Sequence, residues 1–158
     1  MLSELTTQEI TLVNHFNLLQ PQARREVLDY LHYTLFKQYQ QELYSSVLGN
    51  PLIYNGLLQL LHMCEREETS IEQINRKCNI LKFMFYDNYE RVHLKYVDLL
   101  SEIHAESTLF DLGRLGFEHL HIAISSNRKD LIGFEIREFL QFFKKFANQG
   151  DRGRILAV

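Results

Sequence analysis

The sequence predicts an all-α fold, a compact bundle of five to six helices, two of them long. Only two prolines and seven glycines interrupt its 158 residues. Apolar residues recur at steps of three and four, and no strand-like alternation extends beyond a few residues. The 46% hydrophobic and 23% charged content is typical of globular proteins. We therefore expect one helical domain over residues 1–150, followed by a flexible tail over residues 151–158, where no helical pattern remains.

The first helix is predicted to run from about Thr7 to Leu19. Thr6-Thr7-Gln8-Glu9 has the form of a capping box, in which a hydroxyl and a carboxylate satisfy the first free amides of a helix. Four apolar residues at helical spacing are expected to face inward: Ile10, Val13, Phe16 and Leu19.

The second helix is predicted to begin at Pro21, which suits a first turn, and to reach about Ser46. Its apolar residues recur every four positions and are expected to form one buried stripe: Val27, Leu31, Leu35, Tyr39 and Leu43. Gly49 and Pro51 should end it, since glycine favours a helix cap and proline disfavours helix at the preceding residue.

A third helix is expected over residues 52–67 and a fourth after the two overlapping capping boxes at Thr69 and Ser70. From Ile71 the apolar positions step by three and four as far as Ile103, but Asn88 stands where an apolar residue is due. Residues 70–104 therefore form either one long helix or two helices broken at Asp87 and Asn88, and we favour the break slightly.

Two further helices complete the prediction. One begins at the Ser107 cap and buries Phe110, Leu115, Leu120 and Ile124. The last follows Ser126 and Asn127 and ends at residues 148–150. Its expected inward residues are many: Leu131, Ile132, Ile136, Phe139, Leu140, Phe143 and Phe146.

Charge and cysteine content limit the function. The net charge of −3 disfavours a general nucleic-acid binder, although residues 126–154 carry seven basic residues against four acidic ones, a net +3. No apolar run is long enough to span a membrane, and the first residues lack the layout of a signal peptide. Cys64 and Cys78 are expected to be free thiols in a reducing compartment, which predicts a cytoplasmic protein that does not engage a membrane.

No motif predicts catalysis or a metal site. A nucleophile elbow, a phosphate-binding glycine loop and a dinucleotide fingerprint are all absent from the sequence. Glu90 and His93 match one step of a di-iron site, but no second set of ligands accompanies them. We expect a non-enzymatic protein with no catalytic residue, metal or cofactor. A helical bundle that binds a flat cofactor among its His, Tyr and Phe residues is the second alternative.

Residues 52–95 locally resemble the helix-turn-helix of TetR-type repressors. Ile71, Ile74, Cys78 and Ile80 match the packing positions of that family, and Tyr86 and Tyr89 match its Tyr-x-x-Phe pair. The resemblance implies a turn at Cys78-Asn79, where the family has Ala-Gly. The implied recognition helix, however, offers Leu81, Phe83 and Met84 with Lys82 as its only cation, whereas base readout requires donors and acceptors. We therefore expect an amphipathic helix whose three apolar side chains lie against another helix or another molecule.

Residues 18–37 resemble the short helical segment of small bacterial proteins associated with antitoxins, through Leu19, Pro21, Glu26, Val27, Leu28, Asp29, Tyr30 and Leu35. The resemblance implies a dimerising or partner-binding helical hairpin and a bacterial or phage origin.

The predicted function is that of a helical regulatory or adaptor protein that binds a protein partner, with a homodimer as one form. The apolar residues beyond the needs of single helix stripes are the predicted partner-binding residues: Phe83, Met84, Phe134 and Phe142. The first alternative is a DNA-binding transcriptional regulator with a degenerate helix-turn-helix. Its contacts would come from Arg76, Lys77 and Lys82.

Overall fold

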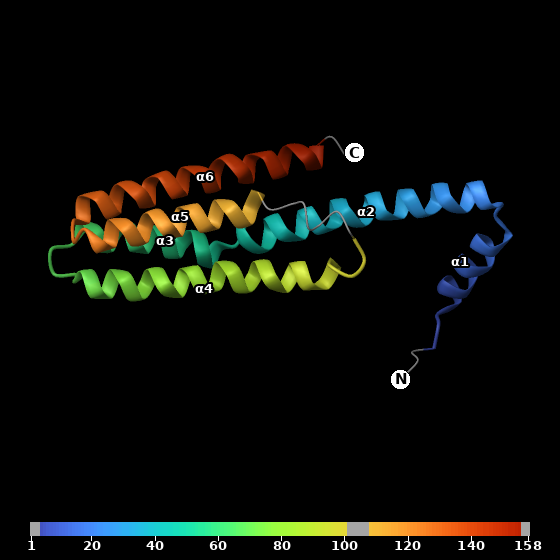
Figure 1. Cartoon of the computed structure of the whole chain (residues 1–158), viewed down its shortest axis with the longest axis horizontal. Coiled ribbons are helices and arrows are strands. Elements are labelled where there is room, and N and C mark those ends of the chain that lie inside the picture. Colours follow the sequence, from blue (N-terminus) through green and yellow to red (C-terminus); the bar gives the residue numbers. More distant parts are fainter. Residues whose placement is uncertain (1–3, 101–107, 156–158) are drawn as a thin grey trace. The chain divides into compact units, whose positions relative to one another are not determined.

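The computed structural model describes residues 4–100 and 108–155, and the side chains of these up to residue 145. All of the regular structure in these ranges is helical, which confirms the predicted fold class. The six helices are α1 (Thr7–Leu18), α2 (Pro21–Val47), α3 (Pro51–Glu65), α4 (Ile71–Tyr96), α5 (Thr108–Ser125) and α6 (Lys129–Ile155) (Figure 1). No described helix is long and apolar enough to cross a membrane.

The helices start where side chains cap them. The predicted capping box at Thr6 is confirmed, since the Glu9 carboxylate accepts from the Thr6 amide (2.6 Å) and the Thr6 hydroxyl accepts from the Glu9 amide (3.3 Å). Of the two boxes predicted before α4, Ser70 with Gln73 forms, with bonds of 3.0 and 3.2 Å. Each box satisfies amides that a bare helix start would leave free.

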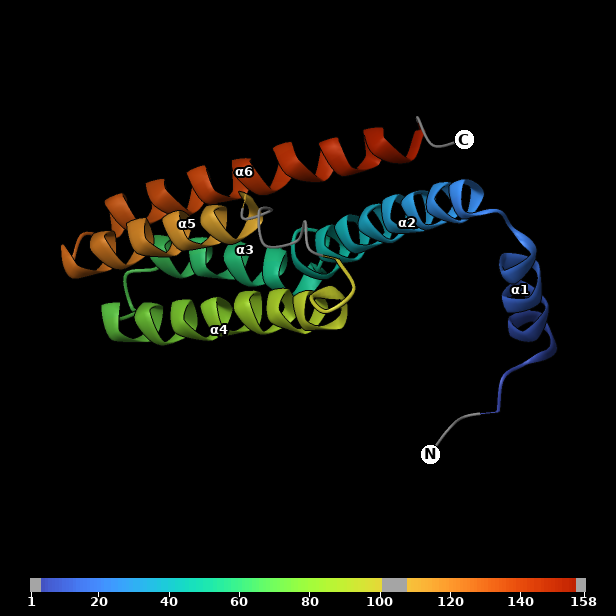
Figure 2. The ribbon, with the colours of Figure 1, turned by 45° about the vertical axis from the view of Figure 1, so that its right-hand side comes forward.

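The chain divides into two compact units, residues 1–37 and residues 38–158. No described residue before Gln38 is buried, and the single domain expected over residues 1–150 stays a prediction. Within the second unit, α3, α4, α5 and α6 form a ring in which each helix packs on two neighbours. Successive helices run in opposite directions, as Figures 1 and 2 show, so this unit is an up-down-up-down four-helix bundle.

Aromatic rings fill the middle of the bundle. Phe117 of α5 lies 5.7 Å from Phe85 of α4 and 5.1 Å from Phe139 of α6, each edge to face. Glycines on α5 admit two of these rings: a Cβ at Gly113 would overlap Phe85, and one at Gly116 would overlap Phe139. These glycines lower helix propensity but allow close packing in the bundle.

The favoured break at Asp87 and Asn88 is wrong, because α4 runs without interruption from Ile71 to Tyr96. Aspartate and asparagine cost a helix interior only about 0.7 kcal/mol each. Asp87 also accepts a hydrogen bond from Arg91 (2.7 Å), and Phe85 and Val92 on either side are buried in the core. Ile103 lies outside the described residues.

The predicted inward face of α5 is partly wrong. Leu120 and Ile124 are buried as expected, but Phe110 and Leu115 are exposed. The buried face instead follows Gly113 and Phe117, because the glycines let α5 approach the rings of its neighbours on that side. The Ser107 cap falls outside the described residues.

The last helix is longer than predicted, since α6 continues through residues 148–150 and ends at Ile155. One glycine in a helix costs about 1 kcal/mol, which does not stop a helix by itself. Residues 151–155 of the predicted flexible tail are therefore helical. Leu131 is exposed, and the Phe146 side chain lies outside the described range. The other residues of the predicted core of α6 are confirmed as buried: Ile132, Ile136, Phe139, Leu140 and Phe143.

The predicted single stripe on α2 is wrong for its first members. Tyr39, Leu43 and Val47 are buried, whereas Val27 is 41% and Leu31 is 49% exposed. A helix turns about 100° per residue, so a stripe of every fourth residue drifts about 40° at each step. Over the five steps from Val27 to Val47 the drift is about 200°, and the two ends of the stripe face opposite ways.

Candidate functional site

Exposed large hydrophobic residues are most closely spaced in the described part of the N-terminal unit, with ten of them between Leu5 and Tyr33. We call its described part, residues 4–37, the arm: it contains α1 and the part of α2 up to Lys37. None of the twelve residues of α1, all of which are described, is buried. The predicted inward positions of α1 are therefore corrected: Ile10 and Val13 are each 48% exposed.

Arg24 holds the turn between the two helices of the arm. The Arg24 guanidinium donates to the backbone carbonyls of Leu19 (3.0 Å) and Asn17 (2.6 Å). It also lies 5.7 Å from the centre of the Phe16 ring. These bonds satisfy carbonyls at the end of α1 that no helix bond would use. The turn is thus held by polar and cation–π contacts, and the apolar side chains of the arm are left facing water.

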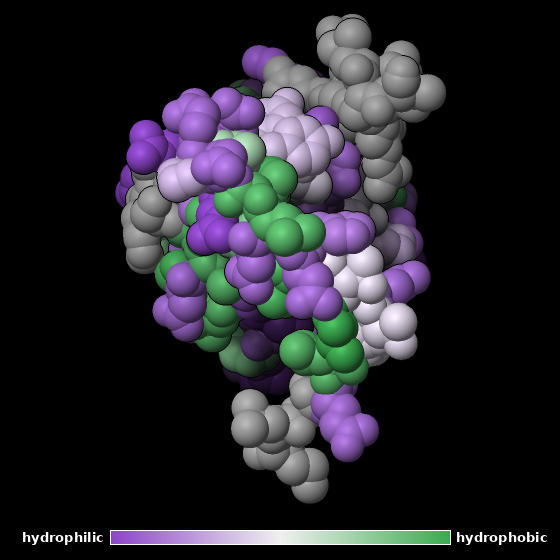
Figure 3. All heavy atoms as spheres, turned by 90° about the vertical axis from the view of Figure 1, so that its right-hand side faces the viewer, coloured by the Kyte–Doolittle hydropathy of each residue, from purple (hydrophilic) through white to green (hydrophobic). Residues whose placement is uncertain are grey.

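Figure 3, in which this end of the chain faces the viewer, shows hydrophobic side chains among hydrophilic ones on the surface. The large hydrophobic residues of the arm that are exposed are ten in number: Leu5, Ile10, Leu12, Val13, Leu18, Val27, Leu28, Tyr30, Leu31 and Tyr33. Isolated exposed apolar residues are ordinary in proteins, whereas this segment gathers ten of them within residues 4–37.

The predicted partner-binding residues do not form one surface. Phe83 on α4 is 71% exposed, Phe134 and Phe142 on α6 are exposed, and Met84 is half-buried. Phe83 and Phe134 each stand two residues, about 200° of helix, from a buried core residue, so both face away from the bundle. Because α4 and α6 are diagonal in the ring, the two rings lie on opposite sides of the bundle.

The residues of the DNA-binding alternative lack the geometry that the resemblance implies. α4 continues as helix through Cys78 and Asn79, where a turn would be needed. Leu81 is buried, as expected, and would be contacted by a Cβ added at Gly56 of α3. Arg76 is exposed but paired with Glu72, and Lys77 and Lys82 are half-buried. The three cations therefore do not line a free helix face.

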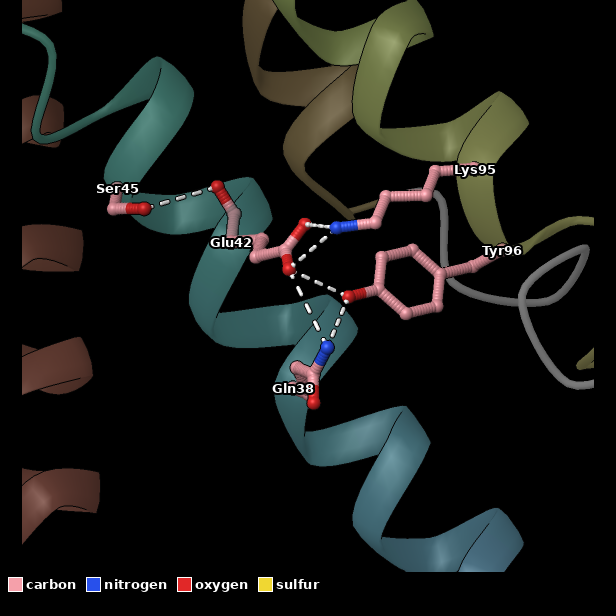
Figure 4. Close-up of polar contacts among 5 residues, drawn as sticks. All are labelled: Gln38, Glu42, Ser45, Lys95 and Tyr96. Carbon is pink, nitrogen blue, oxygen red and sulfur yellow. Dashed lines mark hydrogen bonds and ion pairs between the residues drawn. The ribbon is translucent and has the colours of Figure 1, made fainter. Parts of the chain in front are cut away.

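A polar cluster joins the end of α2 to the end of α4 (Figure 4). The Tyr96 hydroxyl donates to the Glu42 carboxylate (2.7 Å) and accepts from the Gln38 amide (2.8 Å), and Lys95 donates to both Glu42 oxygens at 2.9 and 3.1 Å. The Ser45 hydroxyl adds a bond to the Glu42 backbone carbonyl. Sequence analysis missed this cluster, because its members lie more than fifty residues apart.

The charges of this cluster are stable around neutral pH. The bond from Tyr96, followed by that from Lys95, lowers the pKa of Glu42 below its ordinary value. Burial and then the Glu42 carboxylate raise the pKa of Tyr96. A carboxylate that stays ionised and a phenol that stays protonated exchange no proton near neutral pH, so the cluster acts as a clamp between two helices.

His93 and the two cysteines have the donor atoms that could bind a metal or cofactor. His93 stacks on Tyr89, with ring centres 5.8 Å apart, and its Nδ1 lies 3.5 Å from the Tyr39 hydroxyl. Over the described ranges, no three His, Cys, Asp or Glu residues lie together in a way that could hold a metal ion. Both cysteines are free, and burial raises the pKa of Cys78 to about 11.

One pocket opens where α2 meets α3, between Leu48, Pro51 and Tyr54 on one side and Phe143 and Lys144 of α6 on the other. Its volume is 270 Å³. Ligand sites for drug-sized molecules begin at about 300 Å³ and enclose most of the ligand. This open pocket is small for a haem or another flat cofactor.

The molecule is thus a four-helix bundle that carries an N-terminal helical arm with an exposed apolar surface. In comparisons with protein-family models, with curated proteins and with solved structures, no match was found.

Proposed function

We propose that this chain is a non-enzymatic regulatory or adaptor protein that acts by binding another protein, and that the arm is its binding surface. The observation that carries the proposal is the set of exposed apolar side chains on a helical segment in which α1 buries nothing. A short helical hairpin without a core of its own gains little stability from helix propensity alone, because most helical stability in proteins comes from packing of an apolar face.

The energy available to such a surface is substantial. Leu31 is 49% exposed, so a partner could remove about 75 Å² of its apolar area, which is worth about 2 kcal/mol at 25 cal/mol per Å². Several such side chains on one arm would provide the apolar centre that protein interfaces have. The bundle has a buried core of its own, in which Phe and Leu side chains are prominent.

Affinity capture with matched baits tests the proposal. The baits are the full wild-type chain, Leu31→Asp in the arm, and Phe83→Asp on the exposed side of α4. Both substitutions place a charge at an exposed apolar position, so they differ in location and not in kind. We expect proteins from the native host to bind the wild type and Phe83→Asp but not Leu31→Asp.

Other outcomes contradict the proposal. If captured proteins no longer bind Phe83→Asp but still bind Leu31→Asp, the binding surface lies on the bundle and not on the arm. Capture that neither substitution changes would remove the case for an apolar binding surface at either position. Circular dichroism of both variants checks that the bundle remains folded.

A further inference from the structure

We propose that the outer face of α4 binds the same face of α4 in a second copy of the chain, with the two helices antiparallel about a two-fold axis. Along the helix, the axis passes midway between residues 81 and 82. The inference goes beyond the proposed function, because it concerns the bundle and not the arm. Two features of α4 lead to it: an exposed apolar pair that points away from the core, and two opposite charges placed symmetrically around that pair.

Ile80 and Phe83 form the exposed apolar pair. Ile80 is 55% and Phe83 is 71% exposed. At 100° per residue they lie about 60° apart around the helix, and their midpoint lies about 170° from the buried residues Cys78 and Phe85. The pair therefore points away from the bundle core. In both ribbon views α4 lies at an edge of the bundle (Figures 1 and 2), so this face is open to another molecule.

Arg76 and Asp87 stand at equal distances on either side of the apolar pair, Arg76 four residues before it and Asp87 four residues after it. Eleven residues bring the two charges within about 20° of the same direction, and this direction is within about 10° of the midpoint of the pair. Both are exposed, and each takes part in an ion pair of its own helix, with Glu72 and with Arg91 respectively. A guanidinium has five donors and a carboxylate about four acceptor sites, so each can bind a second partner.

One two-fold axis satisfies both features, because residues 76 and 87 have the same midpoint in the sequence as residues 80 and 83. Arg76 of one copy then faces Asp87 of the second copy, and Ile80 lies level with Phe83 of the second copy. All four residues lie within about 30° of the line that joins the two helices, so none is on the back of α4. A parallel pair would instead set like charges against each other. Charges beside an apolar seam set the orientation of paired helices, and a two-fold axis makes each contact occur twice.

Charges farther from the axis do not decide the orientation. Glu72 of one copy comes close to both Glu90 and Arg91 of the second copy, so its contacts with them oppose each other. Glu90 lies one turn beyond Asp87 and adds a second acidic group near Arg76 of the second copy. The attraction between Arg76 and Asp87 therefore determines the sign of the electrostatic contribution.

The size of the apolar pair sets the strength of the dimer. A large side chain presents about 150–200 Å² when fully exposed, so Ile80 and Phe83 together offer roughly 220 Å² of apolar surface in each copy. Stable interfaces bury about 800 Å² per partner, and transient ones bury less. The face therefore suits a weak and reversible dimer, with a dissociation constant on the order of 100 µM.

Charge reversal in the full-length chain tests this pairing by sedimentation velocity over about 10 to 500 µM, a range that brackets the expected dissociation constant. Arg76→Glu sets glutamate against Asp87 of the second copy, and Asp87→Arg sets arginine against Arg76. By symmetry each change makes two attractive contacts repulsive, so we expect the dimer to weaken roughly tenfold. The double variant Arg76→Glu/Asp87→Arg should dimerise more tightly than either single variant. An equimolar mixture of the two single variants should form a heterodimer tighter than either homodimer.

Arg137→Glu is the matched control, because it makes the same change of charge at another exposed arginine that pairs with a glutamate, Glu65 at 3.9 Å. Arg137 belongs to α6, which is diagonal to α4 in the bundle, so this variant should keep the wild-type affinity. Phe83→Asp places two carboxylates beside the axis and should leave only monomer, while circular dichroism checks that each variant is folded. The proposal is overturned if the wild type stays monomeric throughout the range, if neither single reversal weakens the dimer, if the double variant dimerises no better than the single variants, or if Phe83→Asp dimerises like the wild type.

Discussion

Gly113 offers the sharpest test of how the bundle is packed. It lies on the buried face of α5, and a Cβ added there would overlap three atoms along the edge of the Phe85 ring. That ring is fully buried and cannot swing into solvent. It is held edge to face by its neighbours Phe117 (5.7 Å) and Phe143 (6.3 Å). The substitution Gly113→Ala must therefore displace either the ring or the helix.

The size of the effect follows from two opposing contributions. Forcing an extra methyl group into a packed core costs about 1–3 kcal/mol, and the enclosed ring places Gly113→Ala in the upper part of that range. Alanine in place of glycine gains about 1 kcal/mol of helix propensity. We expect a net loss of about 1–2 kcal/mol, which lowers the unfolding temperature by about 5 °C for a unit of this size.

Gly133→Ala is the control, since it makes the same change at another buried glycine of the bundle. The nearest atom to an added Cβ at Gly133 is Leu61 Cδ1 at 3.7 Å, an ordinary contact. This variant should gain about 0.5–1 kcal/mol. Urea and thermal unfolding followed by circular dichroism measure both changes. Trimming the ring in Gly113→Ala/Phe85→Leu should recover part of the loss, and a Gly113→Ala variant as stable as Gly133→Ala would refute the packing described for α5.

Three further predictions address the clamp, the α2 stripe and the buried thiol. Tyr96→Phe removes two hydrogen bonds and should lower the free energy of unfolding by about 1 kcal/mol. The folded pKa of Glu42 is lowered, so the stabilisation that its ionised carboxylate provides is present above the ordinary carboxyl pKa and is lost as the pH falls through the folded pKa. The difference in unfolding free energy between Tyr96→Phe and wild type should therefore become smaller over that pH range in acid titrations. In urea unfolding, Val27→Ala should change the free energy of unfolding by less than about 0.5 kcal/mol, whereas Leu43→Ala, at a side chain only 3% exposed, should lower it by about 2–4 kcal/mol. Equal losses of unfolding free energy in the two variants would contradict the drift of the stripe. Cys78, with a pKa of about 11, should react with a disulfide reagent at pH 8 far more slowly in the folded chain than in urea, and an equally fast reaction would show that its thiol is accessible.

Local sequence signals located the helix starts well. Thr6 with Glu9 and Ser70 with Gln73 form their caps from side chains and amides three residues apart, so neither depends on the rest of the fold. The same holds for the start of α3, where Pro51 suits the first turn and the Asn50 side chain accepts from the Leu52 amide; the expected glycine cap is not formed, since Gly49 has no positive φ. The polar clamp could not be predicted in this way, because Glu42 and Tyr96 meet only after the helices pack.

Helix faces were harder to predict than helix positions. Leu115 of α5 has the spacing of a core residue but is exposed. Gly113 has no side chain that an apolar pattern could include, yet it lies on the buried face. The reason is that the side of a helix that is buried depends on the shape of the helices packed against it. Here Phe85 and Phe139 project toward α5, and only glycines admit them. The predicted partner-binding residues on α4 and α6 stay a prediction: Phe83, Phe134 and Phe142 are exposed, but the structure shows no partner on them.

Composition, spacing and caps alone determined that the chain is helical, where most helices begin and that a bundle core would form, because these depend on properties of neighbouring residues. Tertiary structure alone decided that α4 is continuous and which side of α5 is buried. Those outcomes depend on contacts between helices far apart in the sequence, where the shape of a partner surface outweighs the weak preference of any single residue.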